Sequence, residues 1–255
     1  MMPFEELTES QRAYRLEEAL KLSEEARKNL YGIGMQKERT VHSVLKFYLE
    51  PDSEQHEIPI GSFIADIYHR DPPEVLEIQT ANFGNLRKKL DAFLQEMPVT
   101  VIYPIPWHKW VYWSDPEIGE VSSGHKSPKT GQLYMILPEL YRISSYLCHP
   151  RLSFWPVLRD VKEYRILDGW SQDKKRGAHR IDRIPTQIGP SALIRTPQDL
   201  VRLLPPLPHP FTAKDFLHAT HFSPRASSYA LSALRSVGSV TQCGTQGRSF
   251  LYQTL

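Results

Sequence analysis

Two apolar runs separated by a strong turn signal constrain the fold of this chain more than any other feature. Residues 62–69 and 75–80 have the length and the residue types of β-strands. Between them lies Arg70-Asp71-Pro72-Pro73, a sequence that favours a tight turn. We therefore expect an antiparallel hairpin whose pairing is centred on the bond between Asp71 and Pro72.

The segments around this hairpin predict a mixed α/β core. Helical periodicity covers residues 5–30 and 36–50, and a further strand-like run covers 57–60. After the hairpin, residues 82–97 form an amphipathic helical pattern that Pro98 ends, and residues 99–105 form an apolar run of strand length. The remaining elements that we expect are strands at 109–113 and 157–167 and a largely helical segment at 133–147.

Two carboxylates interrupt the apolar strands of the hairpin. Asp66 lies within the first strand and Glu77 within the second, although acidic residues are depleted in strands and costly to bury without a partner. In the expected register the two residues lie directly opposite each other, with Cβ atoms about 5 Å apart. Such a pair is stable if a divalent cation lies between the carboxylates or if one of them is protonated.

A third carboxylate lies on the preceding helix. Glu38 falls in the apolar stripe of residues 36–50, three positions before Val41. It could complete a metal-binding cluster with the hairpin carboxylates. For each of these acidic residues taken alone, the alternative is a carboxylate at the edge of the core that an arginine or lysine neutralises.

This order of residues resembles the PD-(D/E)XK nuclease superfamily. The family pattern is a glutamate on a helix, an aspartate on a strand and a Glu-x-Lys strand, and here it reads Glu38, Asp66 and Glu77-Ile78-Gln79. The resemblance implies a restriction-endonuclease-like mixed-sheet core flanked by helices. It also implies a phosphodiesterase that depends on Mg²⁺ or Mn²⁺, in which Asp66 and Glu77 hold the metal and Glu38 assists.

The chain departs from the family pattern at one catalytic position. Gln79 replaces the lysine that, in the family, orients or deprotonates the attacking water. A glutamine can orient water through its amide but carries no charge. Lys88 or Lys89 of the next helix could supply the charge. The simpler expectation is that both side chains lie on the solvent-exposed face of that helix.

The C-terminal residues 211–254 resemble a winged helix-turn-helix domain. Two helices starting near Thr212 and Pro224 precede two short strands around a glycine-containing turn. We expect Ala226, Ala230, Leu234 and Val237 to pack inward, and the candidate nucleic-acid contacts to be Arg225, Ser228 and Arg235 on the second helix and Arg248 on the wing. The alternative is a small domain that contacts protein.

Charge is distributed unevenly along the chain. Residues 166–255 carry 11 basic and 5 acidic residues, whereas the whole chain carries 31 and 29. The run Lys174, Lys175 and Arg176 is a further candidate contact to a phosphate backbone. This asymmetry is consistent with a polyanionic partner such as DNA, and also with a fluctuation of solvated surface charge.

Composition excludes several classes of protein. Hydrophobic residues make up 40% of the chain, and charge is balanced, so a disordered chain is not expected. No apolar stretch reaches the roughly 18 residues that a membrane span needs, and the acidic N-terminal residues do not resemble a targeting peptide. Only Cys148 and Cys243 are present, which favours a reducing, cytoplasmic location over a disulfide framework.

Together these features predict four segments along the chain. They are an N-terminal helical extension (1–33), a nuclease-like domain (34–185), a proline-rich linker (186–210) and a winged-helix domain (211–255). The expected function is a metal-dependent DNA endonuclease of the restriction, defence or mobile-element kind, acting as a homodimer or with a partner subunit. The alternative is a catalytically inactive nuclease fold that serves as a DNA-binding or adaptor protein.

Overall fold

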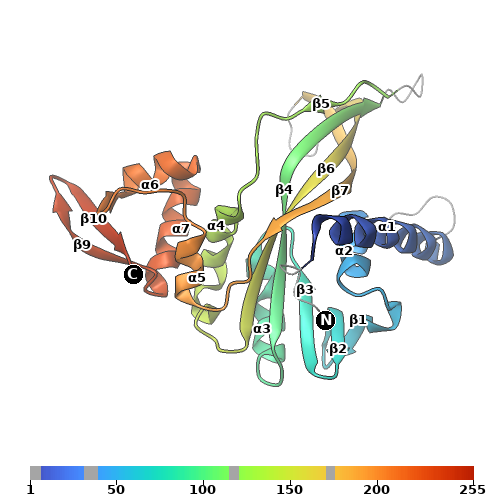
Figure 1. The fold of residues 1–255 in the computed structure, drawn as a ribbon, viewed down its shortest axis with the longest axis horizontal. Helices are drawn as coiled ribbons and strands as arrows, with labels where there is room; N and C mark the ends of the chain where they lie inside the picture. Colours follow the sequence, from blue (N-terminus) through green and yellow to red (C-terminus); the bar gives the residue numbers. More distant parts are fainter. Residues whose placement is uncertain (1–6, 32–39, 115–120, 171–175) are drawn as a thin grey trace. The chain divides into compact units, whose positions relative to one another are not determined.

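The computed structural model describes residues 7–31, 40–114, 121–170 and 176–255 (Figure 1). The helices are α1 (Glu9–Tyr31), α2 (Thr40–Leu49), η2 (Ser53–Gln55), η3 (Phe83–Leu86), α3 (Arg87–Phe93), η4 (Leu133–Ile136), α4 (Leu137–Leu140), η5 (Tyr141–Tyr146), α5 (Pro197–Arg202), α6 (Ala213–Thr220) and α7 (Pro224–Ser236). The strands are β1 (His56–Ile60), β2 (Phe63–Arg70), β3 (Pro73–Ile78), β4 (Val99–Ser114), β5 (His125–Lys126), β6 (Leu152–Trp170), β7 (Arg176–Ser191), β8 (Phe211–Thr212), β9 (Val240–Gln246) and β10 (Ser249–Thr254).

The main sheet is mixed. In the described ranges it has seven strands in the order β1-β2-β3-β4-β6-β7, with β5 paired to β4. Strand β3 runs parallel to β4, whereas β2 and β3 pair in the antiparallel sense, as do β6 and β7. Helices flank this sheet, and the mixed α/β class expected from the sequence is confirmed.

The chain forms two compact units, each assembled from separate stretches of sequence. Unit 1 contains Met1–His56, Pro104–Gln132 and Val157–Ser191, and unit 2 contains Glu57–Tyr103, Leu133–Pro156 and Ala192–Leu255. This division differs from the four continuous segments expected from the sequence. The long strands β4 and β6 contribute residues to both units. A boundary placed at a proline-rich stretch of sequence does not reveal strands of this kind.

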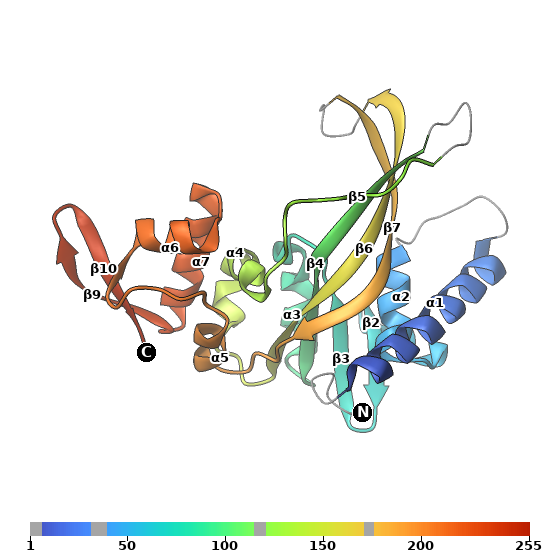
Figure 2. The same ribbon diagram turned by 45° about the horizontal axis from the view of Figure 1, so that its top comes forward.

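Unit 1 is a helix pair packed on a strand. Helix α1 packs against α2, beside which it lies in Figure 2, and both helices contact β7. The apolar side chains Leu16, Val44, Leu45, Val161 and Ile188 are buried. The helix pair also holds a buried polar contact, because the hydroxyl groups of Ser23 and Ser43 are 2.8 Å apart.

Unit 2 has one hydrophobic core that includes the C-terminal residues. Buried members of this core come from β3, α3 and α4 and also from α6, α7 and β10. Helix α7 packs against α4, with Ala230 and Leu234 buried and Ala226 and Val237 partly buried. The inward face expected for this helix is therefore the face that packs, but it is also buried against elements that precede residue 211.

Two local boundaries differ from the sequence prediction. The helical pattern of residues 82–97 divides into η3 and the shorter helix α3, after Asn82 adopts a left-handed conformation with φ of 54°. The expected linker contains regular structure, because β7 continues to Ser191 and α5 follows. Thr196 and Asp199 form a reciprocal capping box at the start of α5, which explains why a helix begins in a proline-rich stretch.

No helix in the described part of the chain is both long enough and apolar enough to cross a membrane.

Candidate active site

The hairpin of β2 and β3 brings Asp66 and Glu77 together. Its ladder runs from Arg70↔Pro73 to Ile67↔Leu76, which is the register expected from the turn. At the open end of the ladder the Asp66 N–H donates to Glu77 Oε1 at 3.3 Å. The Ile78 N–H donates to Asp66 Oδ2 at 2.8 Å. Each carboxylate therefore accepts a backbone hydrogen bond from the opposite strand.

Glu77 lies in an environment that disfavours its negative charge. The residue is only 2% exposed, because β3 lies between β2 and β4 in the sheet. Burial and the neighbouring charge of Asp66 raise the pKa of Glu77 to about 7, although Lys89 acts in the opposite direction. A cation beside this carboxylate is therefore favourable.

In the structure that cation is Lys89. Its Nζ atom lies 2.7 Å from Glu77 Oε2 and 3.0 Å from Glu77 Oε1, and its side chain is 26% exposed. The neighbouring Lys88 on α3 is exposed. The expectation that both lysines are solvated is thus wrong for Lys89, because the direction of α3 turns this side chain toward β3.

Gln79 follows directly after β3 and is anchored by the backbone around it. Its N–H donates to the carbonyl oxygen of Ile102 at 2.9 Å. Its side-chain Nε2 donates to the carbonyl oxygens of Ala81 and Asn82, the latter at 3.3 Å. The amide nitrogen is therefore used to hold the turn before η3, and the amide oxygen is the part of Gln79 that remains to contact water.

Some of the predicted site residues lie outside the described part of the chain. Glu38 falls in residues 32–39, and Lys174 and Lys175 fall in residues 171–175. Arg176 is described as the first residue of β7, through its backbone alone. The predictions made for these four residues stay predictions.

The predicted nucleic-acid contacts of the C-terminal residues are exposed. Arg225, Ser228 and Arg235 lie along the side of α7 that does not pack inward. The Arg225 guanidinium lies over the ring of Tyr229, 5.3 Å from its centroid, and its Nε donates to the Tyr229 hydroxyl at 2.9 Å. Arg248 is exposed in the turn between β9 and β10, where Gly247 has φ of 60°.

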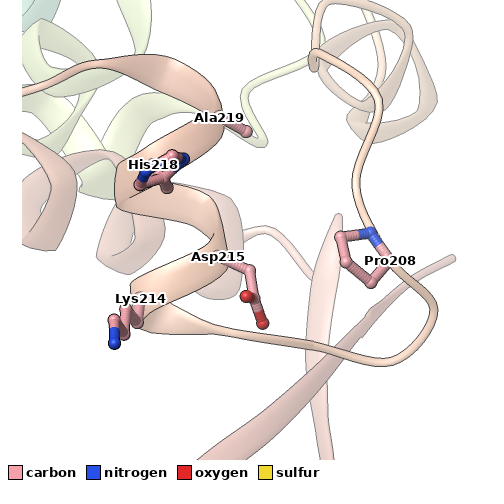
Figure 3. Close-up of a pocket in the computed structure, with 5 residues that line it drawn as sticks. All are labelled: Pro208, Lys214, Asp215, His218 and Ala219. Atoms are coloured by element: carbon pink, nitrogen blue, oxygen red, sulfur yellow. The ribbon is translucent and has the colours of Figure 1, made fainter.

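A pocket in unit 2 contains one acidic residue, Asp215, which is engaged in capping a helix. The pocket has a volume of about 330 Å³ and is lined by Pro208, Lys214, Asp215, His218 and Ala219 (Figure 3). The Asp215 carboxylate caps α6, because it accepts hydrogen bonds from Thr212 N at 2.8 Å and Thr212 Oγ1 at 2.7 Å. These hydrogen bonds lower the pKa of Asp215. Its function is to start the helix, and it does not add to the candidate active site.

Comparisons with known proteins place the hairpin carboxylates within a described family. The model of a domain of unknown function, DUF8091, matches residues 39–195, which include Asp66, Glu77 and Lys89. A protein of Treponema pallidum (strain Nichols), described as uncharacterized, is 28% identical over 218 residues, covering 85% of each chain. No solved structure matches the chain. The family model covers more than half of the residues of this chain, and the chain therefore belongs to the DUF8091 family.

Proposed function

We propose that this protein is a metal-dependent endonuclease that hydrolyses DNA phosphodiester bonds. The observation that carries the proposal is the group formed by Asp66, Glu77 and Lys89. The two carboxylates lie on adjacent antiparallel strands, and each accepts a hydrogen bond from the backbone of the other strand. Lys89 forms an ion pair with Glu77, the more buried of the two. We also propose that the main sheet has a restriction-endonuclease-like fold. It is supported by the element order β2-β3-α3-β4 and by the parallel pairing of β3 with β4.

The donor set of this group fits Mg²⁺ or Mn²⁺. These ions prefer oxygen ligands, and Mg²⁺ is commonly held by one or two carboxylates while water and substrate phosphate complete its shell. Within the described residues no group of three or more His, Cys, Asp or Glu side chains is arranged to hold a metal. Asp66 and Glu77 would supply the two protein ligands of the site, and a bound ion would supply an acidic water and neutralise phosphate charge.

The remaining side chains have separate tasks in this proposal. The backbone bond from Ile78 fixes the position of the Asp66 carboxylate, so that little reorganisation is needed on binding. Lys89 brings a positive charge to the place where phosphate charge develops. Gln79 presents its amide oxygen to the attacking water, because its amide nitrogen is already bonded to the turn.

DNA recognition would come from the C-terminal residues. The order β8-α6-α7-β9-β10 is that of a winged helix-turn-helix, and α7 would be its recognition helix. Its exposed Arg225, Ser228 and Arg235, together with Arg248 of the wing, are of the types that contact phosphates and base edges. A homodimer or a partner subunit would allow both DNA strands to be cut. A role in restriction, defence or mobile-element processing follows from the same resemblance.

A second candidate is an inactive nuclease fold that binds DNA or serves as an adaptor. The observation that favours it is the state of Gln79, which lacks the family's lysine charge and has its amide nitrogen bonded to backbone. In that case Asp66 and Glu77 would be neutralised by protonation and by Lys89 alone, with no metal.

The two candidates are separated by a cleavage assay. Supercoiled and linear DNA would be incubated with the full-length protein and Mg²⁺ or Mn²⁺, and the wild type compared with Asp66→Ala and Glu77→Ala. Cleavage that requires metal and both carboxylates supports the endonuclease. The absence of both cleavage and metal binding by the folded wild type would leave the binding protein as the better account.

A further inference from the structure

A second pocket of unit 2 is lined by arginines and tyrosines. It has a volume of about 330 Å³, and its lining residues are Gly84, Arg87, Tyr141, Arg142, Ser144 and Tyr229. These residues come from η3, from the first residue of α3, from η5 and from α7. None of the six is among the nucleic-acid contacts expected from the sequence, and only the fold brings them together.

The two arginines retain donors that can reach a ligand. Arg87 uses its Nε to donate to the backbone carbonyl oxygen of Arg142 at 2.7 Å, which holds the Arg87 side chain against the Arg142 main chain. Arg142 Nε lies 4.0 Å from Glu139 Oε2, a long contact, and Glu139 Oε2 also accepts the N–H of Phe83 at 3.2 Å. Both arginines are exposed. An arginine has five N–H donors, so most of those in this pocket face solvent.

The tyrosines form an ordered stack beside these arginines. The rings of Tyr141 and Tyr229 lie 4.5 Å apart between centroids, with an interplanar angle of 5°. The Arg225 guanidinium also contacts the Tyr229 ring. Because Arg225 belongs to the exposed side of α7, the pocket is continuous with the residues proposed to contact DNA. Tyr141 is 40% exposed, and its ring gives the pocket a flat, polar-edged wall.

We propose that this pocket binds a phosphate of the DNA backbone beside the recognition helix. The proposal rests on the proposed function, since it assigns part of the DNA-binding surface. The planar forks of Arg87 and Arg142 match the geometry of phosphate oxygens, and the hydroxyl group of Ser144 adds a neutral donor. The pocket fixes the position of the duplex, and base readout belongs to the residues of α7.

Salt dependence of DNA binding tests this assignment. The full-length protein would be titrated onto a short DNA duplex without divalent cations, over a series of KCl concentrations, as the wild type and as Arg87→Gln/Arg142→Gln. Each phosphate contact contributes about 0.9 to the slope of log K against log salt, so losing this one contact should lower the slope by about 0.9 and the affinity at low salt at least tenfold. Thermal unfolding would check that the double variant is folded.

A matched control has the same change of charge elsewhere in unit 2. Arg70 and Arg202 are both exposed, and Arg202 contacts Asp199 on its own helix. The double variant Arg70→Gln/Arg202→Gln should keep the wild-type slope. An equal fall in this control, or an unchanged slope in Arg87→Gln/Arg142→Gln, would overturn the proposal.

Two further measurements separate this proposal from its alternatives. Inorganic phosphate would be titrated into the wild type at constant ionic strength. Binding of free phosphate without any binding of duplex would overturn the assignment to DNA. Cleavage would be measured separately with Mg²⁺. A wild type that binds DNA through the pocket but does not cut it would leave the pocket assignment standing and remove the hydrolytic function.

Discussion

The Nζ atom of Lys89 lies within 3.0 Å of both carboxylate oxygens of Glu77, although the two residues belong to different elements of unit 2. Glu77 lies on the central strand β3, and Lys89 lies on the helix that follows the hairpin. A buried glutamate next to a second carboxylate needs such a cation. The contact puts a positive charge beside Glu77, two residues before the uncharged Gln79.

We predict that Lys89→Met reduces DNA cleavage by about 100-fold or more, the usual effect of removing one charge-stabilising donor from an active site. The measurement is the single-turnover rate with Mg²⁺ at saturating protein. Lys88→Met is the matched control, since Lys88 is the neighbouring residue and is exposed. Equal rates for the two variants would show that Lys89 has a structural function and no part in hydrolysis.

We predict that Mn²⁺ or Mg²⁺ raises the melting temperature of the wild type. A ligand that binds only the folded state at 100 times its Kd stabilises by about 2.7 kcal/mol. Asp66→Asn should lose most of this gain, because a neutral amide is a poorer ligand for a hard cation. Glu74→Gln, on the same strand as Glu77, should keep it. A gain that persists in Asp66→Asn would place the metal elsewhere.

The hairpin could be predicted from the sequence because its signals are local. The turn residues and the alternation of apolar side chains fix the register, and the register places Asp66 next to Glu77. The contact of Lys89 could not be predicted in the same way. It depends on where α3 begins, and the sequence pattern starts a helix at residue 82 whereas α3 begins at Arg87.

We predict that acid destabilises unit 1 through Glu163. This side chain is fully buried, and it accepts hydrogen bonds from Arg165 Nε at 2.8 Å and from Arg183 Nε at 2.7 Å, with Lys109 3.7 Å away. Burial disfavours its charge, but the hydrogen bonds from the two arginines outweigh burial and lower the pKa of Glu163 to about 2. The lowered pKa corresponds to about 3 kcal/mol of stability.

The sign of this effect follows from the two pKa values. Because the folded state holds the carboxylate charged down to lower pH, the stabilisation is present above about pH 4.5 and is lost as the pH falls toward 2. Urea unfolding at several pH values in this range measures it. Glu163→Gln should be destabilised by about 3 kcal/mol at neutral pH and show a shallower dependence. Glu96→Gln, at an exposed position, should resemble the wild type.

We predict that Arg159→Met stabilises the protein by at least about 1 kcal/mol. Arg159 is 2% exposed, and within the described part of the chain its Nε and Nη1 atoms have no hydrogen-bond partner. Burial and the charge of Arg183 lower the pKa of Arg159 to about 9. Keeping the Arg159 guanidinium charged at pH 7 therefore reduces the stability of the folded state. Methionine keeps much of the volume without that cost. The free energy of unfolding in urea at pH 7 checks this, and a loss of stability would contradict it.

The association of the C-terminal residues with the core could not be predicted from sequence. The pattern of α7 shows that Ala230 and Leu234 face inward, and this is confirmed. Periodicity does not say which element covers that face, and in the structure α4 contributes to it. Likewise, Arg87 and Arg142 are far apart in the sequence, so only the fold brings them into one pocket with Tyr229.

The most direct test of the central claim is the rate at which the protein nicks supercoiled DNA with Mg²⁺. The wild type would be compared with Asp66→Asn and with Glu74→Gln, after thermal unfolding shows that each is folded. We predict that EDTA abolishes nicking and that Glu74→Gln leaves the rate near that of the wild type. Asp66→Asn should reduce the rate by at least about 1000-fold, because it removes both a metal ligand and a negative charge from the site. Nicking at equal rates by the wild type and Asp66→Asn, or no nicking by a wild type that binds DNA, would contradict the central claim.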